Sequence, residues 1–422
     1  MSVTEDKRNK IDRRNFIKSI GAAGLYSIGA YGQPTTESNE PNAAKEEQNA
    51  LLPQLPKRKL GKTGVEVPVL ALGTNRLDNQ VILRAALKRG IYYWDTAHSY
   101  MEGNSELTIG KFLAQNPQLR EKLFIVSKAS GAWQAQTPQA VVAEVQKRFE
   151  TSLQRMNTTY IDMYYVVHGL SDPSQLTDEL RQWVENAKKK KLIRFTGFSA
   201  HKNMADNLKA AASLGWIDAA MASYNFRLMQ DEQLRAAIEA CHKAGVAVIA
   251  MKTLGLRTDH KVETEADKKI VEPFLSRGFT DLQANIKAVL SNEKITAACV
   301  GMNSVAHLAS NAAAATDGEK LSQQDMDALQ QYAKATCSGY CAGCANICDS
   351  ALGQMPYVSD IMRYLMYYNS YGQKEMAKKL FAEIPYHVRT KLCTTDYAPA
   401  EKMCPQNLPI ARLISEAAVK LA

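Results

Sequence analysis

The chain has 422 residues, of which 45% are hydrophobic, and it carries a formal net charge of +9. This length accommodates one large domain and a smaller one, and the composition is that of a protein that buries a core. The charge does not indicate a nucleic-acid partner, because the basic residues are scattered. Their densest run, Lys188 to Lys191, ends an expected helix and has no interleaved aromatic residues.

The N-terminal part of the chain has the pattern of a targeting segment followed by a linker. Arg13 and Arg14 precede a modest apolar stretch that is too short and too weakly apolar for a good membrane-spanning helix. Paired arginines before an apolar residue and a lysine resemble a twin-arginine export signal. We therefore expect a signal peptide at residues 1–32, a flexible linker at 33–57, and export to the periplasm by the twin-arginine translocation machinery. The mature protein is expected to have no stable transmembrane helix, and a chance arginine pair before an N-terminal helix is the alternative.

From Arg58 onward, eight short apolar runs alternate with amphipathic stretches such as residues 137–156, whose apolar residues recur at helical spacing. Such units require parallel strands, and eight of them close into a TIM barrel. No Gly-x-Gly-x-x-Gly follows the first run, which disfavours an open doubly wound sheet. We predict an α/β fold: a (β/α)8 barrel over residues 58–318 with a smaller, mostly helical extension at 319–422. The expected strands are 67–73, 92–97, 123–128, 162–168, 193–199, 219–224, 247–252 and 296–302.

Polar residues stand at the ends of three consecutive expected strands. Asp95 ends the second run and leads to Tyr100, Lys128 ends the third, and His168 ends the fourth. Each of them alone is compatible with a structural role. Because the carboxyl ends of barrel strands meet at one rim, where barrel enzymes place their chemistry, we expect the four side chains to converge.

These four groups suit proton transfer. The ordinary pKa of a tyrosine is about 10, and a nearby Lys128 ammonium is expected to lower the pKa of Tyr100 towards working pH. Asp95 is expected to keep Lys128 charged and oriented, and His168 to donate a hydrogen bond to a carbonyl oxygen. The set lacks a serine or cysteine nucleophile, so it predicts protonation of an alkoxide while another group delivers hydride.

The same residues resemble the aldo/keto reductase family, which has DTAxxYGxGxSE after the second strand, Lys after the third and His after the fourth. This chain reads DTAHSYMEGNSE at 95–106, IVSK at 125–128 and YYVVH at 164–168. Further similar segments are RKLGKTGVEVPVLALGTNR, LIRFTGFSAH and SYNFR, and the resemblance covers roughly residues 58–315. It implies a TIM barrel that uses a nicotinamide cofactor, with Tyr100 as the proton donor, Lys128 and Asp95 tuning it, and His168 orienting the carbonyl.

The resemblance also implies a cofactor site. Ser199 matches the position that contacts the nicotinamide carboxamide, although Ala200 stands where an Asn is common. Met251 replaces an aromatic residue that stacks on the ring in many members. Gly301 and His307 stand where Lys and Arg would neutralise a 2′-phosphate, so both NADP and NAD remain open. The implied cofactor-binding residues are Gly73, Thr74, Ser199, Met251, Lys252, Ser304 and Asn311.

The extension contains six of the eight cysteines. The Cys404-Pro405 pair resembles the end of bacterial ferredoxin motifs, and the tail is similar to the ferredoxin-type extension of some exported aldo/keto reductases. Six thiols rather than eight permit one all-thiolate cluster. Zinc and disulfides are the alternatives. We predict one [4Fe–4S] cluster on Cys337, Cys341, Cys344 and either Cys348 or Cys404, and we expect Cys241 and Cys299 to be small buried side chains.

Together these features predict an exported NAD(P)-dependent oxidoreductase that interconverts a carbonyl and an alcohol of a small molecule such as a sugar, polyol, aldehyde or ketone. The cluster would couple it to an electron-transfer partner. Two alternatives stay open: a non-catalytic cofactor-binding barrel that serves as a sensor or subunit, and an electron-transfer protein with disulfides in place of the cluster.

Overall fold

The structure is a computed structural model, and it describes residues 54–255, 269, 272–274, 276–335, 340–353, 357–369, 372–404 and 406–422. The expected signal peptide, most of the expected linker and Cys337 lie outside these residues. Among the helices in the described ranges, none is both long enough and apolar enough to span a bilayer.

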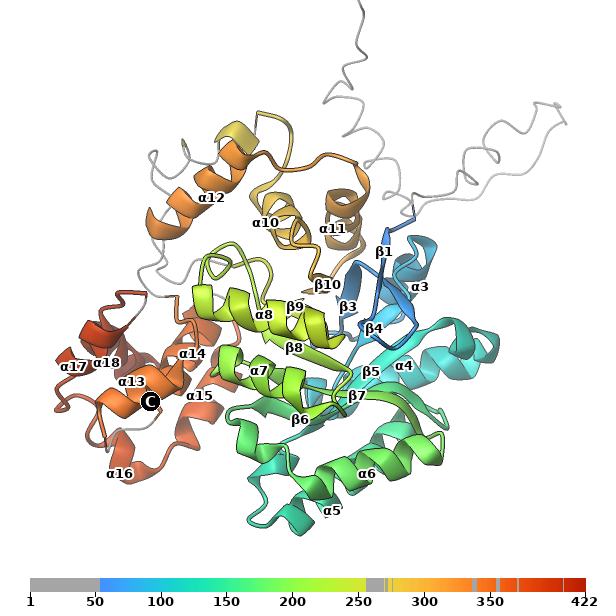
Figure 1. Ribbon diagram of the computed structural model, residues 1–422, viewed down its shortest axis with the longest axis horizontal. Helices are drawn as coiled ribbons and strands as arrows, with labels where there is room; N and C mark the ends of the chain where they lie inside the picture. The colour runs from blue at the N-terminus through green and yellow to red at the C-terminus, as the bar shows by residue number, and fades with distance from the viewer. Residues whose placement is uncertain are drawn as a thin grey trace, which may run out of the picture. The chain divides into compact units, whose positions relative to one another are not determined.

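Eight parallel strands form a closed barrel in the order β10-β3-β4-β5-β6-β7-β8-β9 (Figure 1), which confirms the predicted fold. All seven residues of β5 are buried, as expected for a parallel strand that is covered on both faces. The eight expected runs coincide with the barrel strands to within a few residues. These strands are β3 (Leu70–Gly73), β4 (Tyr93–Asp95), β5 (Phe124–Ser130), β6 (Ile161–Leu170), β7 (Ile193–Ala200), β8 (Ala219–Ser223), β9 (Ala247–Met251) and β10 (Ile295–Gly301).

Alternation along the strands divides the core into two layers. In β9, Ala247, Ile249 and Met251 belong to the cluster that fills the barrel, whereas Val248 and Ala250 belong to the cluster between strands and helices. Successive strand residues point to opposite faces, so each strand contributes to both layers.

The outer helices begin at polar caps encoded in the sequence. Thr137, Thr177, Asp231 and Ser304 each accept a hydrogen bond from a backbone N–H in the first turn of the helix that follows. The helices of the barrel region are α3 (Val81–Lys88), α4 (Asn104–Gln115), α5 (Pro138–Arg155), α6 (Asp178–Lys189), α7 (Met204–Leu214), α8 (Glu232–Ala244), α10 (Asp281–Leu290) and α11 (Val305–Thr316).

A two-stranded hairpin corrects the first expected strand. The run at 67–73 is split into β2 (Glu66–Pro68), which pairs antiparallel with β1 (Lys57–Lys59), and the barrel strand β3. Val67 of the hairpin joins the cluster inside the barrel. Arg58 donates hydrogen bonds to backbone carbonyls at and just before the start of β10, including that of Ile295 at 2.5 Å. The hairpin therefore covers the barrel end at which the strands begin.

The extension is helical, as predicted, and it contacts loops at the opposite barrel end. Asn203, after β7, donates its N–H to the Gly343 carbonyl at 2.9 Å, and Asn225, after β8, donates through Nδ2 to Tyr340 Oη at 2.6 Å. The extension thus packs beside the rim at which catalytic residues are expected. Its helices are α12 (Gln323–Ala335), α13 (Ala345–Ala351), α14 (Val358–Asn369), α15 (Lys374–Ala382), α16 (Tyr386–Arg389), α17 (Ala398–Met403) and α18 (Ile410–Lys420).

Candidate active site

A cavity of about 350 Å³ lies at the carboxyl ends of the barrel strands. The four residues expected to carry the chemistry all line it, although they come from three strands and the loop after β4. Four of the seven implied cofactor-binding residues line it as well. The lining residues predicted from sequence are Gly73, Asp95, Tyr100, Lys128, His168, Ser199, Met251 and Lys252.

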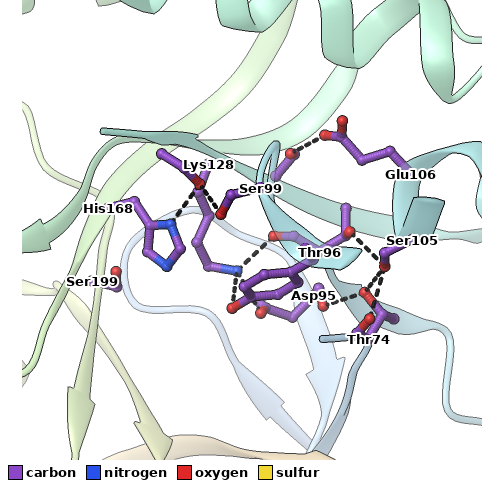
Figure 2. A network of polar contacts seen from close by, with 12 residues as sticks. Thr74, Asp95, Thr96, Ser99, Ser105, Glu106, Lys128, His168 and Ser199 are labelled. Carbon is purple, nitrogen blue, oxygen red and sulfur yellow. Dashed lines mark hydrogen bonds and ion pairs between the residues drawn. The ribbon is translucent and has the colours of Figure 1, made fainter. Parts of the chain in front are cut away.

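Lys128 joins the polar groups at the cavity floor. Its side chain is fully buried, and its Nζ donates to Asp95 Oδ1 at 2.5 Å and to the Thr96 carbonyl at 2.6 Å. The third contact of Nζ is Tyr100 Oη at 3.4 Å. Figure 2 shows Lys128 extending from its strand towards Asp95 and Thr96. The expected convergence of phenol, ammonium and carboxylate is therefore present.

The net shift of the Tyr100 pKa is opposite to the one expected from sequence. Burial is the largest influence, and it raises the pKa of Tyr100 to about 12 although the Lys128 ammonium acts to lower it. The ammonium is near enough to favour the phenolate, but desolvation of the hydroxyl outweighs it. Tyr100 is therefore a protonated phenol at neutral pH, which is the state that a proton donor requires.

Asp95 and Lys128 form a buried ion pair. Burial alone would lower the pKa of Lys128, but Asp95 and Tyr100 raise it above its ordinary value. Burial raises the pKa of Asp95, and the Lys128 ammonium limits that rise. With a contact of 2.5 Å between Nζ and Oδ1, Lys128 is held charged beside Tyr100, as expected.

His168 faces Tyr100 across the cavity. The two rings meet edge to face with centroids 5.8 Å apart. Burial lowers the pKa of His168 to about 3, and the charges of Lys128 and Arg363 add to this effect. The imidazole is therefore neutral at working pH, and Ser130 Oγ lies 2.7 Å from its Nδ1.

The loop that carries Tyr100 has an unusual backbone held by polar contacts. Met101 and Glu102, the next two residues, have positive φ values of 49° and 57°. Arg155 donates through Nη1 to Glu106 Oε2 at 3.2 Å, and Glu106 is fully buried. This ion pair fixes the start of α4 immediately after the strained turn and so helps to place Tyr100. The role of Glu106 was not predicted, although it ends the DTAHSYMEGNSE motif.

The implied cofactor residues fall into two groups. Ser199, the residue before the last one of β7, lies next to His168 in the sheet register, and its Oγ accepts a hydrogen bond from the Gly169 N–H at 3.1 Å. Thr74, Ser304 and Asn311 are not among the lining residues identified in the described part of the chain. Thr74 is buried and donates through Oγ1 to the Asp95 carbonyl at 2.9 Å, so it ties β3 to β4.

Several lining residues were not predicted. His201 comes directly after β7, and Arg76 lies in the loop after β3. Cys299, which was expected to be an ordinary buried side chain, borders the cavity from β10. Gln373 comes from the extension. The extension therefore contributes to the cavity wall, and no short sequence motif signals this contribution.

The described cysteines are free thiols. Cys348 is buried on α13, which packs against α17, and Cys404 immediately follows α17. Among the described residues, no three His, Cys, Asp or Glu side chains are placed to hold a metal ion. Within the described residues, which do not include Cys337, the structure therefore shows no grouped ligand set for the predicted iron–sulfur cluster.

Comparison with known proteins defines the class. The model of the aldo/keto reductase family matches residues 69–334, so the chain belongs to this family and is an oxidoreductase. The chain is similar to the uncharacterized oxidoreductase YqkF of Bacillus subtilis (strain 168), with 23% identity over 307 residues, 66% of this chain and 96% of YqkF. It is also similar to L-galactose dehydrogenase of Arabidopsis thaliana, with 26% identity over 298 residues, 65% of this chain and 92% of that protein.

The fold is similar to a crystal structure of the thermostable aldo-keto reductase Tm1743 in complex with the inhibitor epalrestat. The TM-score is 0.53 at 25% identity, covering 66% of this chain and all of that chain. The family match ends at residue 334, before the cysteines of the extension.

Proposed function

We propose that the protein interconverts a carbonyl and an alcohol of a small molecule by hydride transfer, with Tyr100 as the general acid and base. The observation that carries this proposal is the contact of the buried Lys128 ammonium with both Asp95 and Tyr100 in a cavity at the strand ends. General acids and bases of this kind typically contribute 10²- to 10⁴-fold to rate, as an order of magnitude.

In the reduction, the phenol of Tyr100 donates its proton to the carbonyl oxygen as that oxygen gains negative charge. Lys128 stabilises the phenolate that remains, and Asp95 keeps Lys128 in place. His168 donates a hydrogen bond to the same oxygen and orients the carbonyl. The hydride would come from a reduced nicotinamide bound in the cavity. In the oxidation, the phenolate takes the hydroxyl proton back.

The residues present fit a nicotinamide dinucleotide. Ser199, Met251 and Lys252 line one side of the cavity, and Gly301 and Asn303 line it near the N-terminus of α11, where Ser304 is the cap. Exposed N–H groups at a helix N-terminus favour phosphate. We propose that Ser199 and Met251 hold the nicotinamide end and that Ser304 and Asn311 hold the adenosine phosphate. His307, which stands where an Arg would neutralise a 2′-phosphate, supports no preference for NADP over NAD.

The test is transfer of deuterium from [4-²H]-NADPH or [4-²H]-NADH to a panel of aldehydes, ketones and sugars, followed by mass spectrometry of the alcohol. The proposal expects deuterium in the product with at least one cofactor. If the protein binds the dinucleotide but transfers no deuterium, the alternative of a non-catalytic sensor or subunit is favoured instead. If it binds no dinucleotide, the alternative of an electron carrier is favoured.

We further propose that the chain is exported by the twin-arginine route, on the basis of Arg13 and Arg14. Conversion of both residues to lysine is expected to retain the protein in the cytoplasm, whereas Arg8→Lys, a matched change outside the pair, is expected to leave export unchanged. Export of the doubly substituted chain by the same route would contradict this assignment.

The single [4Fe–4S] cluster also remains a proposal, supported by the thiol-rich tail and by the packing of α13, which carries Cys348, against α17, which Cys404 follows. Protein purified without oxygen is expected to contain about four iron and four sulfide ions per chain. Cys344→Ser is expected to abolish this content, whereas Cys393→Ser, at an exposed thiol outside the set, is expected to preserve it. Stoichiometric zinc or disulfide-bonded cysteines would refute the proposal and with it the coupling to an electron-transfer partner.

A further inference from the structure

Two serine hydroxyls connect the loop of Tyr100 to His168. Ser99 Oγ donates a hydrogen bond to Ser130 Oγ at 2.9 Å, and Ser130 Oγ lies 2.7 Å from His168 Nδ1. Ser130 ends β5 and is the register partner of His168 on β6, while Ser99 immediately precedes Tyr100. Figure 2 shows Ser99 and His168 on either side of this connection, next to Lys128.

The direction of these hydrogen bonds follows from counting protons. A hydroxyl has one proton to donate and two lone pairs that accept. Ser99 supplies the proton of the first contact, so Ser130 keeps its own proton for another partner. In the described part of the chain, Ser130 Oγ has only these two partners, and Ser130 is 9% exposed. Ser130 Oγ therefore donates its proton to His168 Nδ1, which accepts it.

The opposite arrangement leaves a polar group unsatisfied. If Nδ1 carried the proton and donated it to Ser130, the Ser130 oxygen would accept twice and its own proton would have no protein acceptor among the described residues. Such a buried, unpaired donor is unfavourable. A neutral imidazole has one N–H, so an accepting Nδ1 places the proton on Nε2.

We propose that Ser130 is a positioning residue that holds His168 in the tautomer protonated at Nε2, so that the imidazole is ready to donate to a substrate carbonyl oxygen. The assignment of the tautomer rests on the hydrogen bonds alone, whereas its use in catalysis rests on the proposed function. With the other tautomer, the Nε2 lone pair would face the lone pairs of the carbonyl oxygen and could not orient it.

The surroundings keep the imidazole neutral, which the tautomer argument requires. Burial lowers the pKa of His168, and the ammonium of Lys128 and the guanidinium of Arg363 disfavour a second proton. The other titratable groups near it are Tyr100, a neutral phenol at working pH, and His201, whose own pKa is lowered mainly by burial.

The direct test is nitrogen-15 NMR of the full chain labelled at histidine, with the His168 signals assigned by their loss in His168→Gln. Two-bond couplings between ring protons and nitrogens distinguish the two neutral tautomers. The expected wild-type spectrum shows protonated Nε2 and bare Nδ1. Ser130→Thr, which keeps the hydroxyl, is expected to preserve this pattern, and Ser130→Ala is expected to give a mixture of tautomers.

A carboxylate in place of the Ser130 hydroxyl is expected to reverse the tautomer of His168. In Ser130→Asp the side chain only accepts, so it is expected to move the proton to Nδ1. In Ser99→Ala the pattern is expected to persist, because the proton given to Nδ1 belongs to Ser130. A wild-type spectrum with a protonated Nδ1, or a Ser130→Ala spectrum identical to that of the wild type, would overturn the proposal.

Measurements of catalytic activity provide a second test of the role of Ser130. Ser130→Ala is expected to lower kcat/KM for the carbonyl substrate about 10- to 100-fold, less than complete loss of a donor, with an unchanged Kd for the dinucleotide. Ser130→Thr is expected to restore it, and Ser213→Ala, at an exposed hydroxyl on α7, is the matched control. If the tautomer is as proposed but no carbonyl is reduced, the proposed function fails and the tautomer assignment stands.

Discussion

Removal of the Lys128 ammonium should destabilise the fold in a pH-dependent way. Lys128→Met keeps the length of the side chain but leaves Asp95, which is 2% exposed, without its charged donor. The Oδ2 atom of Asp95 already has no hydrogen-bond partner among the described residues. Breaking a buried ion pair on one side costs about 3–5 kcal/mol, so we expect a loss of free energy of unfolding of this size at pH 8.

The sign of the pH dependence follows from the burial of Asp95. Without Lys128, the main influence that opposes burial is gone, and only the hydrogen bond with Cys299 still limits the rise in the pKa of Asp95. The folded variant then binds a proton that the unfolded chain has released, so its stability falls by up to about 1.4 kcal/mol per pH unit above pH 4. The variant should therefore lose less stability at pH 5 than at pH 8, relative to wild type at each pH.

Urea unfolding followed by tryptophan fluorescence at the two pH values measures this difference. The double variant Asp95→Asn/Lys128→Met removes both charges, so it is expected to recover part of the stability and to lose the extra pH dependence. The reasoning is refuted if Lys128→Met matches wild type at pH 8, or if the double variant is less stable than Lys128→Met alone.

Two further predictions concern stability. Burial lowers the pKa of both His168 and His201, so below about pH 6.5 the unfolded state binds protons that the folded state does not. The free energy of unfolding should therefore fall with falling pH by at most about 1.4 kcal/mol per pH unit for each histidine. Melting curves between pH 7 and 4.5 should show a weaker dependence of stability on pH for His201→Gln than for wild type, and an equal dependence would exclude His201 as a contributor. In the extension, a Cβ at Gly343 would lie 2.0 Å from the His201 carbonyl oxygen, whereas a Cβ at Gly353, also at positive φ, meets no described residue within 4 Å. Gly343→Ala should therefore lower stability by about 1–3 kcal/mol more than Gly353→Ala, and equal midpoints in urea would contradict the packing described here.

The barrel and the four polar residues at its rim were predictable because each rests on a local pattern. Short apolar runs mark the strands, and a parallel barrel brings all strand ends to one rim, so Asp95, Lys128 and His168 had to meet. The hairpin was missed because β2 and β3 are separated by one residue, Val69, and read as one run.

Features that depend on several segments were not predictable. The Tyr100 pKa is a balance between burial and the Lys128 charge, and a sequence shows the charge but not the depth of burial. Ser130 and Gln373 have no signature of their own: one is a single serine at a strand end, and the other reaches the cavity from the distant extension.

The central claim is that Tyr100 transfers the proton, and kcat for carbonyl reduction by Tyr100→Phe tests it most directly. Tyr92→Phe is the matched control, because Tyr92 Oη contacts the Glu66 carbonyl of the hairpin at 2.9 Å, away from the cavity. The account predicts that Tyr100→Phe lowers kcat about 10²- to 10⁴-fold with an unchanged Kd for the dinucleotide, and that Tyr92→Phe retains activity. A Tyr100→Phe enzyme that reduces the carbonyl at the wild-type rate would contradict it.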